Sequence, residues 1–393
     1  MRPSLPVLRA ALLASLLACV TAPAIAQDEA PVKFIKPIAA DGNVHVLCRK
    51  EQECGLMNSA GELILEQTYR RLVVSPLIPG AARQVIAEPV GGKTGIFDLT
   101  GKWLLQPDFA YEDLSFLHNN RVAVKREGKW GYADGRGRMV IPAQFESAGD
   151  FLASAAVVRG RENLGLIDVN GTPLTPHKYI KIGDFVDGIA EFMDAGTVAG
   201  LIDIKGKEVV TGFVVTGPLS EGLAMAFRSK KEQGYIDRQG KWVIKTKFGV
   251  RGDFTDGLAI VDKAGKRGYI AGNGKLAIPF KFDFAHDFSE GVATVAQKRK
   301  WGVIDNKGRF LVKPELDYID SFVRGVARAN RGGSLDEFGF ADGAEGLWGV
   351  IDTRGKWIVE PQYESLQING DLIKAWKGGT HYFTLDGKSV QVN

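Results

Sequence analysis

Hydrophobic residues in this chain form short runs separated by polar turns, and the alternation returns at a nearly constant interval. Two clear copies are Trp301–Arg309 and Trp348–Lys356, in which an aromatic and β-branched run is followed by Asp-x-x-Gly. Runs of this composition favour strands, and Asp and Gly favour the turns between them. The pattern therefore predicts an all-β protein with short strands of about five residues.

The constant interval identifies an internal repeat. The glycine of the aromatic run recurs nine times, and successive copies are 34 to 40 residues apart, except for a last step of 47. These glycines are Gly55, Gly95, Gly131, Gly165, Gly200, Gly234, Gly268, Gly302 and Gly349. A fixed period in this range is typical of architectures in which each unit packs on its neighbours.

Each repeat carries two phrases that together predict three strands. The first, as in Glu290–Val295, opens with an acidic residue and Gly, which favour a turn, and continues as an apolar strand. The second contains the aromatic run, the Asp-x-x-Gly turn and a third strand. That strand is expected to end near a proline such as Pro279 or Pro314, because proline lacks the N–H that a sheet needs. We therefore expect a three-stranded antiparallel meander in each unit of about 34 residues.

The Asp-x-x-Gly turns have a structural explanation. Asp stands first in seven of the nine units: Asp98, Asp134, Asp168, Asp203, Asp237, Asp305 and Asp352. Its carboxylate can accept the backbone N–H two residues on, and the closing Gly can adopt positive φ. We expect a type I turn followed by a left-handed Gly. A calcium loop needs several oxygens around one ion, so we predict no metal site here and no cofactor.

A unit of this size cannot bury its apolar face alone, so neighbouring units must supply the core. We expect residues 43–393 to form one domain of about nine repeats plus a partial unit at the C-terminus. This number exceeds the four to eight blades that are usual in a propeller. An open solenoid or superhelix is therefore the favoured arrangement, and a β-propeller-like closed ring is the alternative.

These phrases resemble the bacterial WG-repeat (KWG-repeat) family, as the segment Lys129–Tyr132 illustrates. The resemblance covers nearly all of residues 43–393. Six units depart from it at the Trp position, where they carry Cys54, Thr94, Leu164, Ala199, Gln233 and Arg267. The resemblance implies a binding or scaffold protein and gives no catalytic residues.

The first 26 residues have the pattern of a signal peptide. A positively charged start precedes the apolar run Ala10–Val20, which is too short to span a bilayer, and small residues precede Gln27. The alternative is a lipoprotein anchored through Cys19. Residues 27–42 are expected to be a loose lead-in. Both readings place the protein outside the cytoplasm, periplasmic or secreted, or lipid-anchored.

Two cysteines, Cys48 and Cys54, remain after removal of a leader. An even pair in an exported chain favours a disulfide. They flank a predicted hairpin whose strands would place them opposite one another, and two thiols make a poor zinc site. We therefore predict a structural Cys48–Cys54 bridge.

Charge and motifs exclude several classes of function. The formal net charge is only +4, which gives no basic footprint for nucleic acid, and no later segment is long and apolar enough to span a membrane. No phosphate-binding loop or hydrolase motif is present. The tryptophans are expected to pack in the core, with an exposed ligand platform as the alternative.

The 47-residue step marks an insertion at about 330–346 that breaks the period. Insertions in repeat proteins usually form loops on one face. Apolar and acidic side chains alternate in this one, which makes it a possible binding loop: Asp336, Glu337, Phe338, Phe340 and Asp342.

The sequence thus predicts an exported, non-enzymatic binding or scaffold protein with a protein or cell-envelope ligand. The alternative is a periplasmic hydrolase or carbohydrate-processing enzyme on the same repeats, which would need a pair of carboxylates in a cleft.

Overall fold

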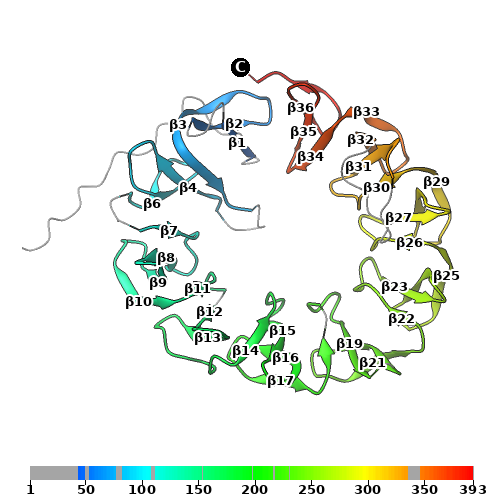
Figure 1. Ribbon diagram of the computed structural model, residues 1–393, viewed down its shortest axis with the longest axis horizontal. Coiled ribbons are helices and arrows are strands. Elements are labelled where there is room, and N and C mark those ends of the chain that lie inside the picture. Colours follow the sequence, from blue (N-terminus) through cyan, green and yellow to red (C-terminus); the bar gives the residue numbers. More distant parts are fainter. Residues whose placement is uncertain are drawn as a thin grey trace, which may run out of the picture.

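The computed structural model describes residues 43–48, 53–76, 82–107, 111–152, 154–196, 198–215, 217–229, 231–334 and 346–392. Within these ranges all regular structure is β, and every strand pair is antiparallel. The strands form small sheets arranged one after another around a central opening (Figure 1). The all-β repeat prediction is confirmed.

Ten successive units can be distinguished in the described part of the chain. Units 1 and 2 share a strand and contain β1 (Val44–Cys48), β2 (Cys54–Asn58), β3 (Leu63–Val74), β4 (Gln84–Pro89), β5 (Gly95–Asp98) and β6 (Trp103–Leu105). Unit 3 contains β7 (Asp113–Leu114), β8 (Val122–Arg126), β9 (Lys129–Ala133) and β10 (Met139–Phe145). Units 4 and 5 also share a strand and contain β11 (Ser147–Ala148), β12 (Ala155–Arg159), β13 (Leu164–Asp168), β14 (Tyr179–Ile182), β15 (Ile189–Asp194), β16 (Ala199–Asp203) and β17 (Glu208–Thr211).

The remaining five units are separate four-stranded sheets. Units 6 and 7 contain β18 (Val214–Val215), β19 (Ala224–Ser229), β20 (Glu232–Ile236), β21 (Trp242–Thr246), β22 (Gly249–Val250), β23 (Leu258–Lys263), β24 (Lys266–Ala271) and β25 (Leu276–Phe282). Units 8 and 9 contain β26 (Phe284–Ala285), β27 (Val292–Gln297), β28 (Lys300–Asp305), β29 (Phe310–Leu316), β30 (Tyr318–Ile319), β31 (Val326–Arg331), β32 (Leu347–Asp352) and β33 (Trp357–Tyr363). Unit 10 contains β34 (Ser365–Asn369), β35 (Leu372–Trp376), β36 (Thr380–Thr384) and β37 (Ser389–Val390).

The units differ from the prediction in strand number. Three strands were expected, but most units carry a fourth, which comes before the other three and in units 6 to 9 is only two residues long. A strand so short has too few positions to show an alternating pattern. The C-terminal unit is partial in sequence, because it lacks the WG pair, yet it also has four strands.

Pro279 and Pro314 do not end the third strand, as had been expected. Pro279 lies inside β25 and Pro314 inside β29, and both strands continue past it. Each of these strands is the last in the order of its sheet. An edge strand tolerates proline because the missing N–H is not needed for a further neighbour, and the residue also blocks pairing with another chain.

The Asp-x-x-Gly turns have the predicted geometry. Asp305 Oδ1 accepts the backbone N–H groups of Lys307 at 3.0 Å and Arg309 at 2.9 Å, and Gly308 has a φ of 74°. The same pair of hydrogen bonds forms in the turns that begin at Asn58, Asp98, Asp134, Asp168, Asp203, Asp237 and Asp352. The carboxylates are therefore occupied by the turn itself.

The WG glycine is required by a close backbone approach. A Cβ atom placed on Gly302 would lie only 2.4 Å from the carbonyl oxygen of Val312 in β29, the last strand of the same unit. A Cβ on Gly268 or Gly349 would likewise lie 2.5 Å from the equivalent carbonyl oxygen, that of Ile278 or Val359. This contact explains why the glycine persists in units that have lost the preceding Trp.

The hydrophobic core lies between units. One cluster joins Ile278 and Phe282 of unit 7 to Val295 and Ile304 of unit 8, all of them fully buried. The turn glycine takes part in the same contact, because a Cβ on Gly308 would lie 2.9 Å from Cγ2 of Ile278 in the preceding unit. Each unit thus completes the core of the one before it, as in a solenoid.

The stack curves until its two ends meet (Figure 1). A Cβ on Gly61 of unit 1 would lie 2.5 Å from Cγ1 of Val390 in unit 10, which is the turn contact seen between consecutive units. Leu47 and Met57 pack with Leu372 and Val390 in a shared buried cluster. The structure therefore combines the predicted solenoid-like stacking with the outline of the alternative, a closed ring.

Within the part of the chain that the structure describes, no helix is long and apolar enough to cross a membrane.

Candidate functional site

The contact between units 1 and 10, here called the junction, differs chemically from the other contacts between units. Asp371, between β34 and β35, accepts hydrogen bonds at both carboxylate oxygens. His45 Nε2 of β1 lies 2.8 Å from its Oδ1, and the Ser59 hydroxyl donates to its Oδ2. Asp371 and these two groups form a polar bridge beside the apolar cluster of the junction. Two ends of the chain are thereby held together without a shared sheet.

A cavity of about 570 Å³, here called the junction cavity, adjoins this bridge. Its wall comes from four units: β1 of unit 1, the end of β3 and Arg83 of unit 2, Arg324 of unit 9, and β35 of unit 10. Only closure of the ring brings these segments together. A cavity of this size is in the range of small-molecule sites.

Three basic side chains line the junction cavity: Arg83, Arg324 and Lys374. The Arg83 guanidinium donates to the carbonyl oxygen of Ser75, at 2.9 Å from Nη2. Burial lowers the pKa of Arg83, the Asp371 carboxylate opposes that effect, and the positive charge of Arg324 lowers it further. The two guanidinium groups, from units 2 and 9, are therefore close enough to repel one another.

A second cavity, of about 600 Å³, lies between units 9 and 10 and shares Arg324, Asn369 and Gly370 with the first. The Arg328 guanidinium on its wall pairs with Asp320 at 2.5 Å and donates to the carbonyl oxygen of Leu366. Arg328 is thus already neutralised. Arg324 is the basic residue common to both cavities.

Arg324 occupies a turn position that is acidic in units 5 to 8. The corresponding residues have positive φ and are followed by Gly: Asp187, Glu221, Asp256, Glu290 and Arg324. The acidic members link units, because Asp256 accepts the N–H of Gly291 at 2.8 Å and Glu290 accepts those of Arg324 and Gly325 at 2.6 Å. A guanidinium cannot accept such a bond. The chain of links therefore ends at Arg324, whose side chain faces the cavities instead.

A second group of ionisable residues comes from units 5, 7 and 8. Burial raises the pKa of Asp287 to about 6, and the nearby Asp253 carboxylate adds to the effect. The pKa of Asp253 is itself raised by burial and by Glu191. The two aspartates pack against glycines of the preceding unit, since a Cβ on Gly252 would lie 2.2 Å from Asp287 Oδ1. In the described ranges, no three His, Cys, Asp or Glu side chains are grouped so as to hold a metal ion.

The tryptophans are packing residues rather than a continuous exposed platform. Trp301 is 1% exposed and stacks on His286, with ring centres 4.6 Å apart. Burial lowers the pKa of His286 to about 4, so its ring is neutral, and Nδ1 lies 2.8 Å from the Thr294 hydroxyl. Trp376, which is outside the repeated motif, is 47% exposed.

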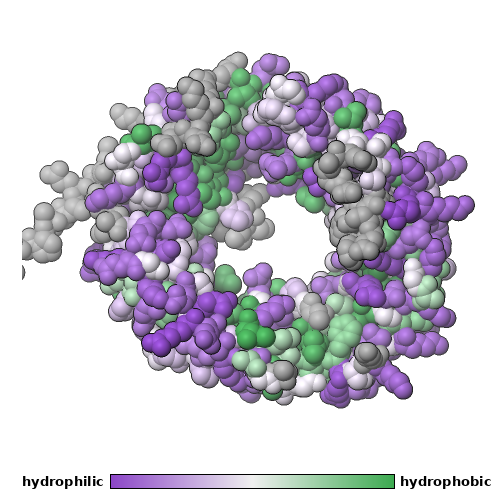
Figure 2. All heavy atoms as spheres, in the orientation of Figure 1, coloured by the Kyte–Doolittle hydropathy of each residue, from purple (hydrophilic) through white to green (hydrophobic). Residues whose placement is uncertain are grey.

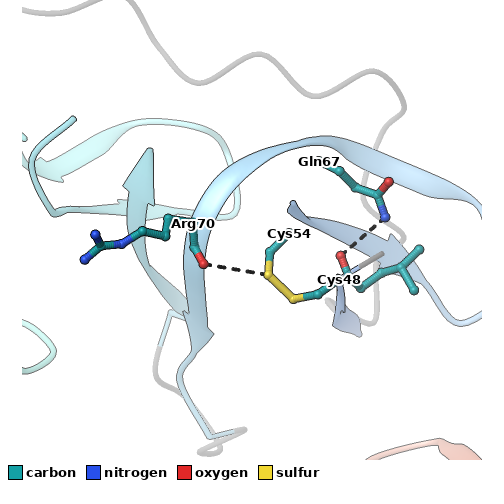
Figure 3. Close-up of a disulfide and its surroundings, with 5 residues drawn as sticks. Cys48, Cys54, Gln67 and Arg70 are labelled. Carbon is teal, nitrogen blue, oxygen red and sulfur yellow. Dashed lines mark hydrogen bonds between the residues drawn. A yellow bond between two sulfur atoms is a disulfide. The ribbon is translucent and has the colours of Figure 1, made fainter. Parts of the chain in front are cut away.

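The predicted disulfide is present in unit 1. Cys48 and Cys54 are paired residues at the ends of β1 and β2, and their Cα atoms are 4.0 Å apart (Figure 3). Cys54 is buried in the core that unit 1 shares with unit 2. The bridge thus fixes the hairpin that carries His45 to the junction.

We expect thiol labelling of the mature, non-reduced protein to find no reactive cysteine. Reduction should lower the free energy of unfolding by about 2 kcal/mol, since the closed loop is short. Mass spectrometry after labelling with iodoacetamide, with and without reductant, measures both states. Two labelled thiols in the non-reduced sample would refute the bridge.

The proposed binding loop, Asp336, Glu337, Phe338, Phe340 and Asp342, lies outside the described residues, as do Cys19, the leader 1–26 and the lead-in 27–42. The insertion of about 330–346 is placed by its flanks. Arg331 at the end of β31 pairs with Leu347 at the start of β32. Residues 330 and 331, the first two of the predicted insertion, therefore belong to β31.

The sequence prediction missed the junction cavity, because its wall combines residues from opposite ends of the chain. One signal was nevertheless available. Aligned repeats show Arg324–Gly325 where other units have an acidic residue before Gly.

The family comparison agrees with the repeat structure. The model described as "WG containing repeat" matches residues 95–130, 130–159, 165–196, 234–266, 268–301, 301–333 and 348–373, which is more than half of the chain. This chain belongs to the WG-repeat family. No protein in the comparison with curated proteins matches it.

Several solved structures are similar to the chain at low identity. A structure titled as the eukaryotic initiation factor is 12% identical and covers 88% of this chain and 94% of its own, with a TM-score of 0.45. BamB from Moraxella catarrhalis is 12% identical and covers 66% and 91%, with a TM-score of 0.35. The computationally designed Ika8 protein is 11% identical and covers 92% and 96%, with a TM-score of 0.31.

Proposed function

We propose that this WG-repeat protein is an exported, non-enzymatic binding or scaffold protein that acts through protein or cell-envelope interactions. The observation that supports it best is that the repeated residues have structural roles, whereas a residue at the junction cavity departs from the repeat. The repeated Asp, Gly and Trp residues are used in turns, close backbone contacts and packing. Arg324, which lines the junction cavity, differs from the acidic residue that units 5 to 8 carry at the same position.

Export is supported by two independent features. The first 26 residues have the composition of a cleavable leader, and the Cys48–Cys54 bridge is of a kind that persists in oxidising compartments. The alternative, a lipid anchor at Cys19, predicts a different mature N-terminus. Intact-mass measurement of the protein from its native envelope distinguishes an N-terminal Gln27 from a lipidated Cys19.

A pull-down from envelope extract tests the binding function. The mature protein is immobilised beside two variants, a deletion of Gly332–Gly343 and the substitution Arg324→Asp. We expect one or more envelope components to be retained by the intact protein at stoichiometric levels. Reduced recovery by the deletion variant would assign the contact to the insertion, and reduced recovery by Arg324→Asp would assign it to the junction.

The hydrolase alternative has one supporting feature, the raised pKa of Asp287, since a carboxylic acid that titrates near neutral pH can transfer a proton. A panel of chromogenic glycosides and esters tests it directly. Turnover that Asp287→Asn abolishes, together with no retained partner, would overturn the binding proposal.

A further inference from the structure

We propose that the junction cavity binds a small anionic amphiphile, with a phosphate or carboxylate group held by Arg324 and Lys374 and an apolar portion against the wall formed by β1, β3 and β35. This inference rests on the proposed binding function and names the chemistry of one ligand. Three observations carry it: the charge of the cavity, the substitution at the repeat position of Arg324, and the apolar wall.

The charge of the cavity is not neutralised internally. Arg324 and Lys374 form no ion pair with any carboxylate in the portion of the chain that the structure describes. The acidic groups near them have other partners. Asp371 contacts His45 and Ser59, Asp320 pairs with Arg328, and Glu290 accepts backbone N–H groups of the turn at Arg324 and Gly325. An oxyanion would supply the missing negative charge, and guanidinium groups bind phosphate and carboxylate with paired hydrogen bonds.

At the position of Arg324 the residue changes from acidic to basic, which is the change that a binding site for an anion requires. Asp256 and Glu290 hold the turn of the following unit through their carboxylates. Arg324 cannot form that link, and it places a positive charge at the junction cavity instead. A purely structural turn gains nothing from this exchange.

The remaining wall of the junction cavity is apolar. Val46, Val73, Val74 and Pro76 line it, and each keeps part of its surface exposed, 37% in the case of Val46. Figure 2 shows hydrophobic side chains along the inner side of the ring near these first units. A ligand with only a charged group would leave this surface in water. Burial of an alkyl chain contributes about 0.8 kcal/mol for each methylene group, so an amphiphile fits better than a free anion.

The test uses isothermal titration calorimetry on the mature protein with three probes: octyl phosphate, inorganic phosphate and octyl glucoside, all below micelle-forming concentrations. We expect one equivalent of octyl phosphate to bind, with inorganic phosphate weaker and octyl glucoside, which has the tail without the charge, showing no saturable binding. The comparison separates a lipid-like ligand from a free phosphate.

The decisive variant is Arg324→Asp. Asp already occupies this position with positive φ in other units, for example at Asp256, so the variant should fold. It should weaken octyl phosphate binding by about tenfold or more, the effect of losing a charged hydrogen bond. Arg354→Asp, at an exposed turn of unit 9 outside both cavities, should bind as the parent does.

Lys374→Gln provides the same test should Arg324→Asp unfold. Unchanged affinity in either folded variant, or octyl glucoside binding as tightly as octyl phosphate, would overturn the proposal. If the ligand proposal is overturned but Arg324→Asp still captures an envelope partner, the binding function is retained without this ligand. An unsubstituted mature protein that binds neither octyl phosphate nor an envelope component would refute both proposals.

Discussion

Replacement of Gly302 by alanine should lower the free energy of unfolding by about 3 kcal/mol, the upper end of what overpacking costs. The added Cβ would lie 2.4 Å from the carbonyl oxygen of Val312 and 2.9 Å from Pro314 N. Neither is a flexible side-chain end that can move aside. β28 and β29 must therefore separate at this close approach, and the core between units 8 and 9 loses its support. Urea unfolding followed by tryptophan fluorescence measures the change.

Gly272→Ala is the matched control for this prediction. Gly272 has no positive φ, and a Cβ there meets no atom within 4 Å. The substitution should be neutral or stabilise by about 0.5 kcal/mol, because it restricts the unfolded chain. Equal effects at Gly302 and Gly272 would show that the close approach of β29 is not what requires the WG glycine.

The second large effect is expected at the junction. Gly61→Ala should lower the free energy of unfolding by about 3 kcal/mol, from backbone strain and overpacking together. Gly61 has a φ of 81°, and a Cβ there would lie 2.4 Å from the carbonyl oxygen of Gln391 and 2.5 Å from Val390. The clash falls on unit 10, so the ring should open as well as lose stability. Thermal unfolding and hydrogen exchange of β36 and β37 report on the two effects.

Gly91→Ala separates the two contributions. Gly91 also has positive φ, 75°, but a Cβ there meets nothing within 4 Å. It should therefore show the backbone strain alone, about 1 kcal/mol. If Gly61→Ala were no more harmful than Gly91→Ala, with unchanged exchange in unit 10, units 1 and 10 would not be in contact.

The features that could be predicted from sequence are the local ones. The turn from Asp305 to Gly308 depends on hydrogen bonds within five residues, so its residue types specify it. Cys48 and Cys54 face one another because they end the same hairpin. The repeat period predicted the stacking of units, since each unit exposes an apolar face that only a neighbour can cover.

The features that escaped prediction depend on distant or very short segments. The curvature that brings Gly61 to Val390 is the sum of small rotations between units, and no single unit encodes it. The junction cavity follows from that closure. Pro279 was misread because its effect on a strand depends on whether the strand lies at an edge, which only the sheet order reveals.

The central claim is that the repeats close into a ring through units 1 and 10, and a thiol cross-link tests it most directly. Ala60 and Gln391 are exposed neighbours of the Gly61–Gln391 contact. The double variant Ala60→Cys/Gln391→Cys is treated with a short bis-maleimide, and Ala60→Cys/Gln239→Cys serves as control, because Figure 1 places β21, which follows Gln239, across the ring. We expect rapid intramolecular linkage of the first pair and none of the second, read by peptide mapping. Absence of a 60–391 link, when both thiols react freely with a mono-maleimide, would contradict the closed ring.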